Sequence, residues 1–190
     1  SAAFNEFSAA ARSLSGSADL QLRGRNALFD ESVYERVASM EGVQTAAPVL
    51  ELDLAVPGQR TQLKLLGIDG FQSAAISPDL IAVPSPEHPF DVLMADTVFL
   101  SPAAMQWLKL SNGDTLTLVS GTRQVKLRVA GSLVRARAGQ KLAVMDIGSA
   151  QWQFARTGQL SRIDLRLTPG VSQAAFRTQL EQQLGPAAVP

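Results

Sequence analysis

An interrupted duplication is the sequence feature that most constrains the fold of this chain. Two segments, residues 19–56 and 161–190, each predict a strand, a capped helix, a glycine and a short Ala-rich extended segment. A long segment rich in predicted strands separates the two copies. This arrangement predicts an α+β scaffold made of two strand–helix–strand units, with a smaller β-rich insert between them.

The first copy opens with alternating polar and apolar residues over 19–23, the period of a half-buried strand. A helix is predicted to follow from Asp30, whose carboxylate can accept a hydrogen bond from a first-turn amide. Phe29 and Tyr34 stand at the two positions of a hydrophobic staple, and Gly42 is placed to end the helix in the left-handed conformation.

The second copy repeats this order. Residues 162–167 alternate in polarity and predict a strand, and Ser172 is placed to cap the helix that follows. Gly185 and Pro186 are expected to end that helix. Residues 187–189 then predict the beginning of a further strand.

From residue 50 to residue 160 the sequence predicts three regions. Residues 50–56 and 61–68 read as an antiparallel hairpin that turns at Pro57-Gly58. Residues 71–97 are rich in proline and serine and predict an extended connector, in which the part from 77 to 89 has no evident role. Residues 98–160 predict the inserted subdomain, with strands at 98–100, 115–119, 124–133 and 142–145 and helices at 103–108 and 149–156.

Composition narrows the class of protein. A chain of 190 residues that is 46% hydrophobic can bury a substantial core. Its formal charge of zero argues against a nucleic-acid partner, because phosphate contacts need a surplus of Lys and Arg. The chain contains no cysteine, which excludes disulfides, thiolate metal sites and thiol catalysis. No apolar run reaches the length of a membrane span, and the first residue is Ser, so we expect the chain to come from a longer protein.

Few residues suggest catalysis or metal binding, and we predict neither a catalytic group, a cofactor nor a metal. His88 is the single histidine; it can act as a general base only beside a positioned partner, and an exposed, inert imidazole is the alternative. Glu51 and Asp53 share one face of a strand and can bind a hard cation or act as an acid–base pair, or can simply face solvent. Asp69 lacks the neighbouring acids of a calcium loop and predicts a turn.

Two surfaces are candidates for contact with other molecules. Six bases cluster on and after the central hairpin and predict either a solvated face or a surface for a partner or acidic lipid: Arg123, Lys126, Arg128, Arg135, Arg137 and Lys141. Over residues 1–18, four apolar residues recur at helical spacing: Phe4, Phe7, Ala11 and Leu14. They predict a helix that either packs on the domain or continues from a membrane span as a juxtamembrane helix.

Several segments, taken in order, resemble the MacB-like periplasmic core domain of FtsX-family ABC transporter permeases. They are Ser15-Gly16-Ser17-Ala18-Asp19-Leu20-Gln21-Leu22-Arg23-Gly24, Met40-Glu41-Gly42-Val43-Gln44-Thr45-Ala46-Ala47-Pro48-Val49, Leu65-Leu66-Gly67-Ile68-Asp69, Val98-Phe99-Leu100-Ser101, Leu110-Ser111-Asn112-Gly113-Asp114-Thr115-Leu116 and Arg162-Ile163-Asp164-Leu165. The resemblance covers nearly the whole chain.

The resemblance implies a porter-like α+β subdomain over residues 19–70 and 161–190, interrupted by a sabre-like β-rich subdomain over 98–160. It implies a non-enzymatic periplasmic domain of a bacterial inner-membrane permease, placed between the first two membrane-spanning helices, that relays ATP-driven movement in export or efflux. The implied partners are the rest of the permease, a cytoplasmic ATPase subunit, a second permease copy and a periplasmic protein. An alternative is a periplasmic domain that captures a lipid or peptide between its two subdomains.

Overall fold

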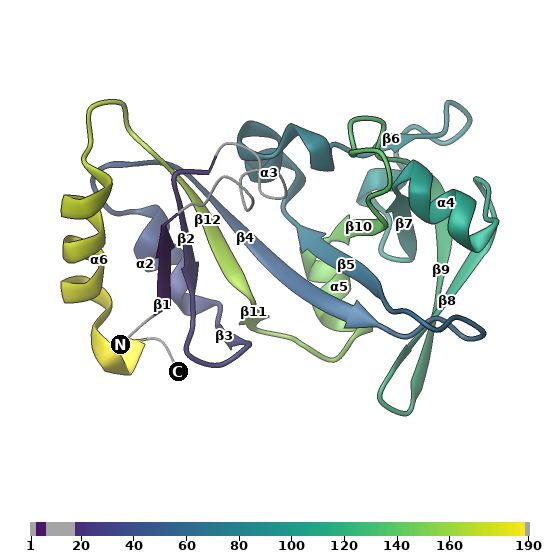
Figure 1. The fold of residues 1–190 in the computed structure, drawn as a ribbon, viewed down its shortest axis with the longest axis horizontal. Coiled ribbons are helices and arrows are strands. Elements are labelled where there is room, and N and C mark those ends of the chain that lie inside the picture. The colour runs from purple at the N-terminus through teal and green to yellow at the C-terminus, as the bar shows by residue number, and fades with distance from the viewer. Residues whose placement is uncertain (1–2, 7–17, 189–190) are drawn as a thin grey trace. The chain divides into compact units, whose positions relative to one another are not determined.

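A computed structural model describes residues 3–6 and 18–188 of the chain. Within these ranges the chain forms two compact units. Unit 1 comprises the described residues up to Leu50, residues 71–78 and the described residues from Gly158 onward, and unit 2 comprises residues 51–70 and 79–157. Each unit combines strands with helices, so the predicted α+β class is confirmed (Figure 1).

Unit 1 has four neighbouring strands in the order β1-β2-β12-β4, and a separate pair, β3 with β11. Its strands are β1 (Ala3–Glu6), β2 (Leu20–Arg23), β3 (Phe29–Asp30), β4 (Val43–Leu54, which enters unit 2 after Leu50), β11 (Gln159–Leu160) and β12 (Arg162–Leu167). Its helices are α2 (Ser32–Ala38), α3 (Gly70–Ile76, whose first residue falls in unit 2) and α6 (Gln173–Ala188). β12 lies antiparallel to both β2 and β4.

The local signals of the duplication produce the elements of unit 1. Asp30 accepts a hydrogen bond from the amide of Ser32 through Oδ1 at 2.8 Å, although the cap position itself is Glu31. Ser172 accepts one from the amide of Ala175 through Oγ at 3.3 Å. Gly42 has a φ of +94°, as a left-handed cap requires.

The core of unit 1 lies where these two copies meet. The two helices contribute buried side chains at helical spacing, and β12 contributes them at alternate positions: Val33, Val37, Phe176, Leu180, Leu184, Ile163, Leu165 and Leu167. Arg36 at the end of α2 donates from Nη2 to the carbonyl of Gln183 in α6 at 2.7 Å. The two capped helices are therefore joined directly.

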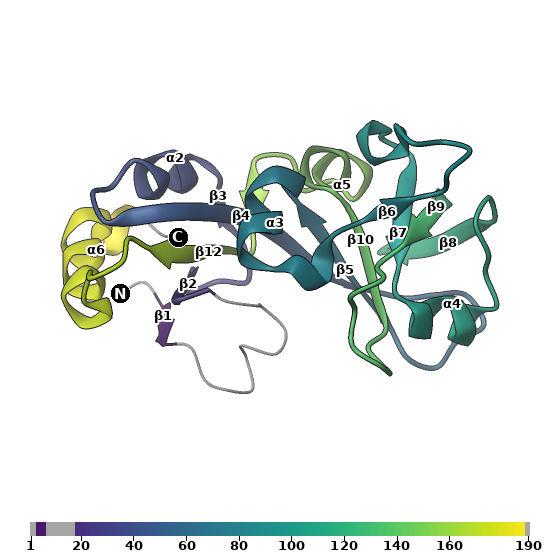
Figure 2. The ribbon, with the colours of Figure 1, turned by 90° about the horizontal axis from the view of Figure 1, so that it is seen from above.

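Unit 2 is built on the strand order β4-β5-β10-β7-β9-β6, with β8 paired to the other part of β9. Its elements are β5 (Leu63–Ile68), β6 (Val83–Pro84), β7 (Thr97–Leu100), β8 (Thr115–Ser120), β9 (Arg123–Ser132), β10 (Leu142–Asp146), α4 (Pro102–Leu108), α5 (Ile147–Gln153) and the 3₁₀ turns η1 (Pro78–Leu80) and η2 (Asp91–Leu93). β10 runs parallel to β5 and antiparallel to β7. Figure 2 shows α4 and α5 on opposite faces of these strands.

Two close fits fix local geometry in unit 2. The Oγ of Ser101 accepts hydrogen bonds from the amides of Ala104 and Leu142, at 3.2 and 3.0 Å, so one buried hydroxyl caps α4 and binds the start of β10. A Cβ added to Gly131 would stand 2.0 Å from the carbonyl oxygen of Val83. Glycine at this position lets β6 approach β9 closely.

Three sequence predictions differ from the structure. Residues 3–6 form strand β1, which pairs antiparallel with β2, and not the start of a helix; backbone pairing along β2 is stronger than the helical spacing of a few apolar residues. Residues 187 and 188 belong to α6 and not to a new strand, although Gly185 interrupts the helical dihedrals with a φ of 59°. The connector over 71–97 contains α3, η1, β6 and η2.

The compact units also divide the chain differently from the predicted subdomains. Residues 51–70 were predicted to belong with residues 19–50, but they lie in unit 2 because β5 pairs with β10 along five residues. Residues 71–78 of the predicted connector belong to unit 1, and residues 79–97 belong to unit 2.

Candidate functional site

A cavity of about 380 Å³ opens in unit 2 beside β9 and brings the single histidine together with one of the predicted bases. Its walls combine polar side chains with backbone: Ser85, Glu87, His88, Asn112, Gly113, Arg128, Val129 and Ala130. Two backbone hydrogen bonds fix the loop over residues 85–88. The N–H of Ser85 donates to the carbonyl of Ala130 and the N–H of His88 donates to the carbonyl of Ser85, both at 3.0 Å. The bond between Ser85 and His88 shapes the loop, and it involves neither side chain.

An ion pair lies at the edge of this cavity. The Nη1 of Arg128 donates to Oδ2 of Asp91 at 2.8 Å, and the side chain of Asp91 is only 10% exposed. The hydrogen bond from Arg128 and its charge, together with the charge of His88, hold the pKa of Asp91 below its usual value although burial opposes them. The sequence grouped Arg128 with five other bases, as a solvated face or as a surface for a partner or acidic lipid, whereas the structure pairs it with an acid 37 residues earlier.

The six predicted bases lie in three settings. Arg123 and Lys126 are exposed on β9, opposite Ser120 and Thr117 of β8. Arg128 pairs with Asp91. The other three are exposed on the segment between β9 and β10, where the Nζ of Lys141 lies 4.5 Å from the ring centroid of Trp107: Arg135, Arg137 and Lys141.

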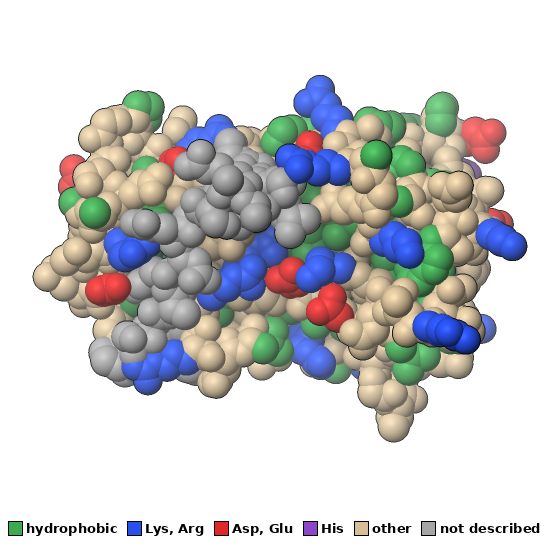
Figure 3. All heavy atoms as spheres, viewed as in Figure 1, with side chains coloured by type: hydrophobic (Ala, Val, Ile, Leu, Met, Phe, Trp, Pro, Cys, Tyr) green, Lys and Arg blue, Asp and Glu red, His purple; other side chains and the backbone are tan. Residues whose placement is uncertain are grey.

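On the face shown in the space-filling view, the basic side chains do not form one continuous patch. In Figure 3 the Lys and Arg side chains appear as several blue groups with tan and green surface between them. A surface for an acidic partner or lipid would need these charges to act together. Contact with such a partner stays a prediction for these six residues.

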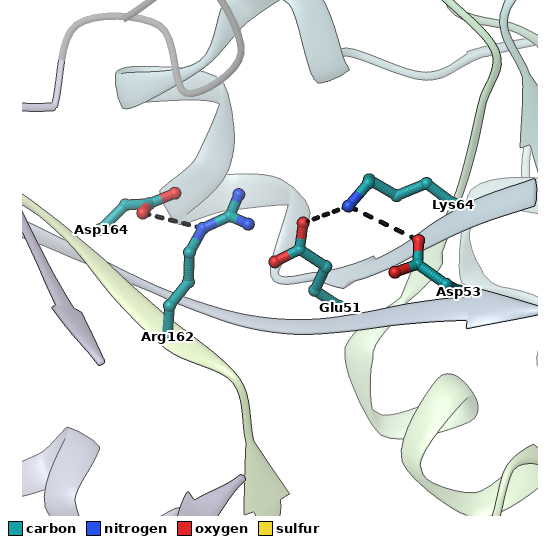
Figure 4. Close-up of polar contacts among 5 residues, drawn as sticks. All are labelled: Glu51, Asp53, Lys64, Arg162 and Asp164. Carbon is teal, nitrogen blue, oxygen red and sulfur yellow. Dashed lines mark hydrogen bonds and ion pairs between the residues drawn. The ribbon is translucent and has the colours of Figure 1, made fainter. Parts of the chain in front are cut away.

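The predicted carboxylate pair on β4 binds a lysine. Figure 4 shows Glu51, Asp53 and Lys64, with Nζ of Lys64 at 2.8 Å from Oε1 of Glu51 and 3.5 Å from Oδ1 of Asp53. Burial lowers the pKa of Lys64, but the hydrogen bond and charge of Glu51 and the charge of Asp53 outweigh it and raise that pKa. The ammonium thus occupies the position that a cation between the carboxylates would take.

A further ion pair is buried in unit 1. The Nε of Arg162 donates to Oδ1 of Asp164 at 3.0 Å, with side chains only 5% and 3% exposed (Figure 4). Asp164 stands opposite Gln21 of β2, which is also buried. The sequence predicted only an alternating strand here and gave no sign that its polar face is covered.

The remaining candidates are placed as follows. Phe4 lies in β1, in register with Leu22, whereas Phe7, Ala11 and Leu14 lie outside the described residues. Asp69 falls between β5 and α3. In the described ranges, 3–6 and 18–188, no three metal-ligating side chains come together. None of the helices in that part of the chain has the length and hydropathy that crossing a bilayer takes.

Sequence reasoning missed an exposed apolar surface in unit 2. Phe90 and Met94 flank η2, Val92 lies within it, and Trp152 lies in α5; all four side chains are exposed. The available signal was a group of large apolar residues within a segment whose prolines preclude a core strand.

No protein-family model matches the chain, and no curated protein matches its sequence. Solved structures do share its fold. The periplasmic region of MacB from Actinobacillus actinomycetemcomitans is 14% identical, with a TM-score of 0.58 over 86% of this chain and 80% of that one. The extracellular domain of the noncanonic ABC-type transporter YknZ from Gram-positive bacteria is 16% identical, with a TM-score of 0.57 over 86% and 82%.

A third structure, a domain of a putative permease protein from Porphyromonas gingivalis, is 15% identical, with a TM-score of 0.51 over 84% of this chain and 71% of that one. These identities are low, so the likeness concerns the fold. At that level the predicted resemblance is confirmed: the chain has the fold of the MacB-like periplasmic core domain.

Proposed function

We propose that this chain is the extracytoplasmic domain of a bacterial ABC transporter permease, on the periplasmic side of the inner membrane. The observation that carries the proposal is the fold shared over 86% of the chain with the periplasmic region of MacB and the extracellular domain of YknZ. Shared fold alone does not transfer function, so the proposal also has to agree with features of this chain.

The position of the first and last elements supports the proposal. β1 and α6 both belong to unit 1 (Figure 1). A domain inserted between two neighbouring membrane-spanning helices has to enter and leave through the same part of its structure. Unit 1 is then the membrane-proximal part of the permease.

We further propose that the domain relays ATP-driven movement to substrate or to a periplasmic protein, in export or efflux. The chain passes between the units four times, after residues 50, 70, 78 and 157, so a displacement of unit 1 has several covalent routes to unit 2. A relay requires packed elements and contact surfaces, and no catalytic group. ATP hydrolysis would belong to a cytoplasmic partner subunit, with a second permease copy completing the complex.

Cysteine labelling tests the location, because the chain has no cysteine of its own. Thr122→Cys places a thiol on the exposed turn between β8 and β9 of the full-length protein. We expect a membrane-impermeant maleimide to label it in intact spheroplasts. Ser101→Cys, at a fully buried position, is the matched control and should react only after unfolding. Labelling of Thr122→Cys only after permeabilisation would contradict the proposed location.

Hydrogen exchange tests the relay separately. The full-length permease with its ATPase partner is compared with and without ATP plus vanadate. We expect nucleotide to change amide protection in α6 and also in the β8–β9 hairpin of unit 2. A change confined to unit 1 would rule out the relay and leave the location intact.

A further inference from the structure

The apolar surface beside α5 is unusual for an exposed part of a domain. We call the four residues Phe90, Val92, Met94 and Trp152 the α5/η2 surface. Phe90 is 75% exposed, Met94 51% and Trp152 71%. Scattered apolar residues on a surface need no explanation, but grouped aromatic and Met side chains are typical of contact sites.

One hydrogen bond joins the two segments that carry this surface. Nε2 of Gln153, at the end of α5, reaches the carbonyl oxygen of Ala95 at 3.5 Å. Trp152 and Met94 are the residues immediately before these two, so they stand on adjoining segments. The surface therefore combines η2 with the last turn of α5.

The η2 segment is held in place before any partner arrives. Oγ1 of the buried Thr97 donates to the carbonyls of Asp91 and Met94, at 2.7 and 2.8 Å. The Asp91–Arg128 ion pair anchors the same turn to β9. A preformed surface loses little conformational entropy on binding, which favours affinity.

The charges around the α5/η2 surface are acidic. No Lys or Arg occurs between Lys64 and Lys109, whereas this stretch contains five acids, of which Glu87 and Asp96 are exposed close to η2. Asp146 adds an exposed carboxylate at the start of α5.

Two bases are bonded to the segments that carry this surface. Arg128 pairs with Asp91, and Nη1 of Arg156 donates to the carbonyls of Phe154 and Ala155. The carboxylate of Asp91 balances the charge of Arg128, whereas Arg156 keeps its positive charge, because carbonyls are neutral. The three exposed carboxylates of Glu87, Asp96 and Asp146 outnumber it, so the net charge of these groups is negative.

We infer that the α5/η2 surface docks a basic amphipathic helix of a partner protein. The apolar face of such a helix would cover Phe90, Met94 and Trp152, and its Lys or Arg side chains would meet Glu87, Asp96 and Asp146. The same acids repel an anionic lipid surface. The inference rests on the proposed function in one respect, that the partner is an extracytoplasmic protein.

Trp152 supplies the test, because the chain has only two tryptophans. Trp107→Phe leaves Trp152 as the single reporter. The probes are two synthetic amphipathic peptides of about 18 residues, long enough for several helical turns, with the same Leu face and either Lys or Glu on the polar face. We expect the Lys peptide to shift Trp152 emission to the blue and to bind at least about tenfold more tightly than the Glu peptide. Added salt should weaken the binding of the Lys peptide, because it screens the charges.

Substitutions then locate the binding. Phe90→Ser and Met94→Ser, each in the Trp107→Phe background, should lower the affinity for the Lys peptide about tenfold, a loss typical of a contact residue. Val134→Ser is the matched control, since Val134 is a 62% exposed apolar residue on the segment after β9. Circular dichroism confirms that each variant is folded.

Three results would overturn the inference. The first is no spectral change up to about 1 mM Lys peptide, weaker than any specific docking. The second is equal binding of both peptides, and the third is a blue shift produced by phosphatidylcholine vesicles alone, which would make lipid the occupant. None of these affects the cysteine labelling, so failure of the surface and failure of the proposed function are distinguishable.

Discussion

Arg162 and Asp164 lie two residues apart on one face of β12, and the Nε of Arg162 donates to Oδ1 of Asp164 across 3.0 Å in the interior of unit 1. Removing one member of a buried ion pair takes an opposite charge away from the other member, which costs far more than the pair contributes. We therefore expect Asp164→Ala to lower the free energy of unfolding by about 3–5 kcal/mol. The double variant Arg162→Met/Asp164→Leu should lose less.

Urea unfolding followed by circular dichroism measures these losses. Both tryptophans lie in unit 2, so their fluorescence reports that unit, and a shift seen by both probes would mean that the units unfold together. A loss below about 1 kcal/mol for Asp164→Ala, the range of exposed ion pairs, would show that this pair is not sealed from water.

The Asp91–Arg128 ion pair should make unit 2 sensitive to acid. The pKa of Asp91 is lower in the folded than in the unfolded protein. The ion pair therefore stabilises the folded state at pH values above the pKa of an unfolded Asp, about 3.9. This stabilisation is lost as the pH falls through the pKa of Asp91 in the folded protein. We expect Asp91→Asn to destabilise the protein at pH 6 and to cost progressively less towards pH 3.

Tryptophan fluorescence in urea at several pH values checks this. Glu87→Gln, which removes an exposed acid of the same loop, controls for the change in net charge. A penalty for Asp91→Asn that stays constant from pH 6 to pH 3 would mean that the ion pair contributes nothing.

The hydroxyl of Ser101 should contribute more to the free energy of unfolding than a single hydroxyl usually does. Ser101→Ala removes the acceptor of two amides, those of Ala104 and Leu142, in a fully buried position. We expect a loss of about 1–3 kcal/mol in urea unfolding. Ser172→Ala, which removes the exposed cap of α6, should cost about 0.5–1 kcal/mol. An equal cost at both positions would argue against the role of the bond to β10.

Gly131→Ala should separate β6 from β9. The added methyl would stand 2.0 Å from the carbonyl oxygen of Val83, so one strand has to move, at a cost of about 1–3 kcal/mol. Loss of amide protection at Ser85, which donates to Ala130, would report the separation in hydrogen exchange. Gly70→Ala is the control, since nothing lies within 4 Å of its added Cβ. Unchanged protection at Ser85 would contradict this prediction.

Local signals in the sequence predicted most of the secondary structure. The alternation in residues 162–167, the cap at Ser172 and the glycine at residue 42 correspond to β12, the start of α6 and a left-handed turn. Each depends on the chemistry of a few neighbouring residues, which can be read without the fold. Strand β1 was missed because it depends on its pairing with β2, about 17 residues along the chain.

The candidate site was harder to predict for the same reason. Arg128 meets Asp91 across 37 positions, and Gln153 meets Ala95 across 58. The separation of the two residues in each pair corresponds to no helical or strand period. Such a period predicts whether a residue is exposed or buried, but not which distant residue it contacts. Lys64 with Glu51 is the intermediate case, because the predicted hairpin placed both on facing strands.

Helix α3 has a consequence for how this architecture can be inherited. Its residues from Phe71 onward belong to unit 1, where Ile76 packs with Ala18 and Ala47, although the chain on either side of residues 71–78 belongs to unit 2. A gene segment encoding residues 51–157 therefore carries a piece of the other unit's core. Recombination that exchanged this segment between relatives would leave a hole beside Ala47 unless the incoming α3 fitted it. The two units are thus expected to diverge together and to be replaced only as a whole.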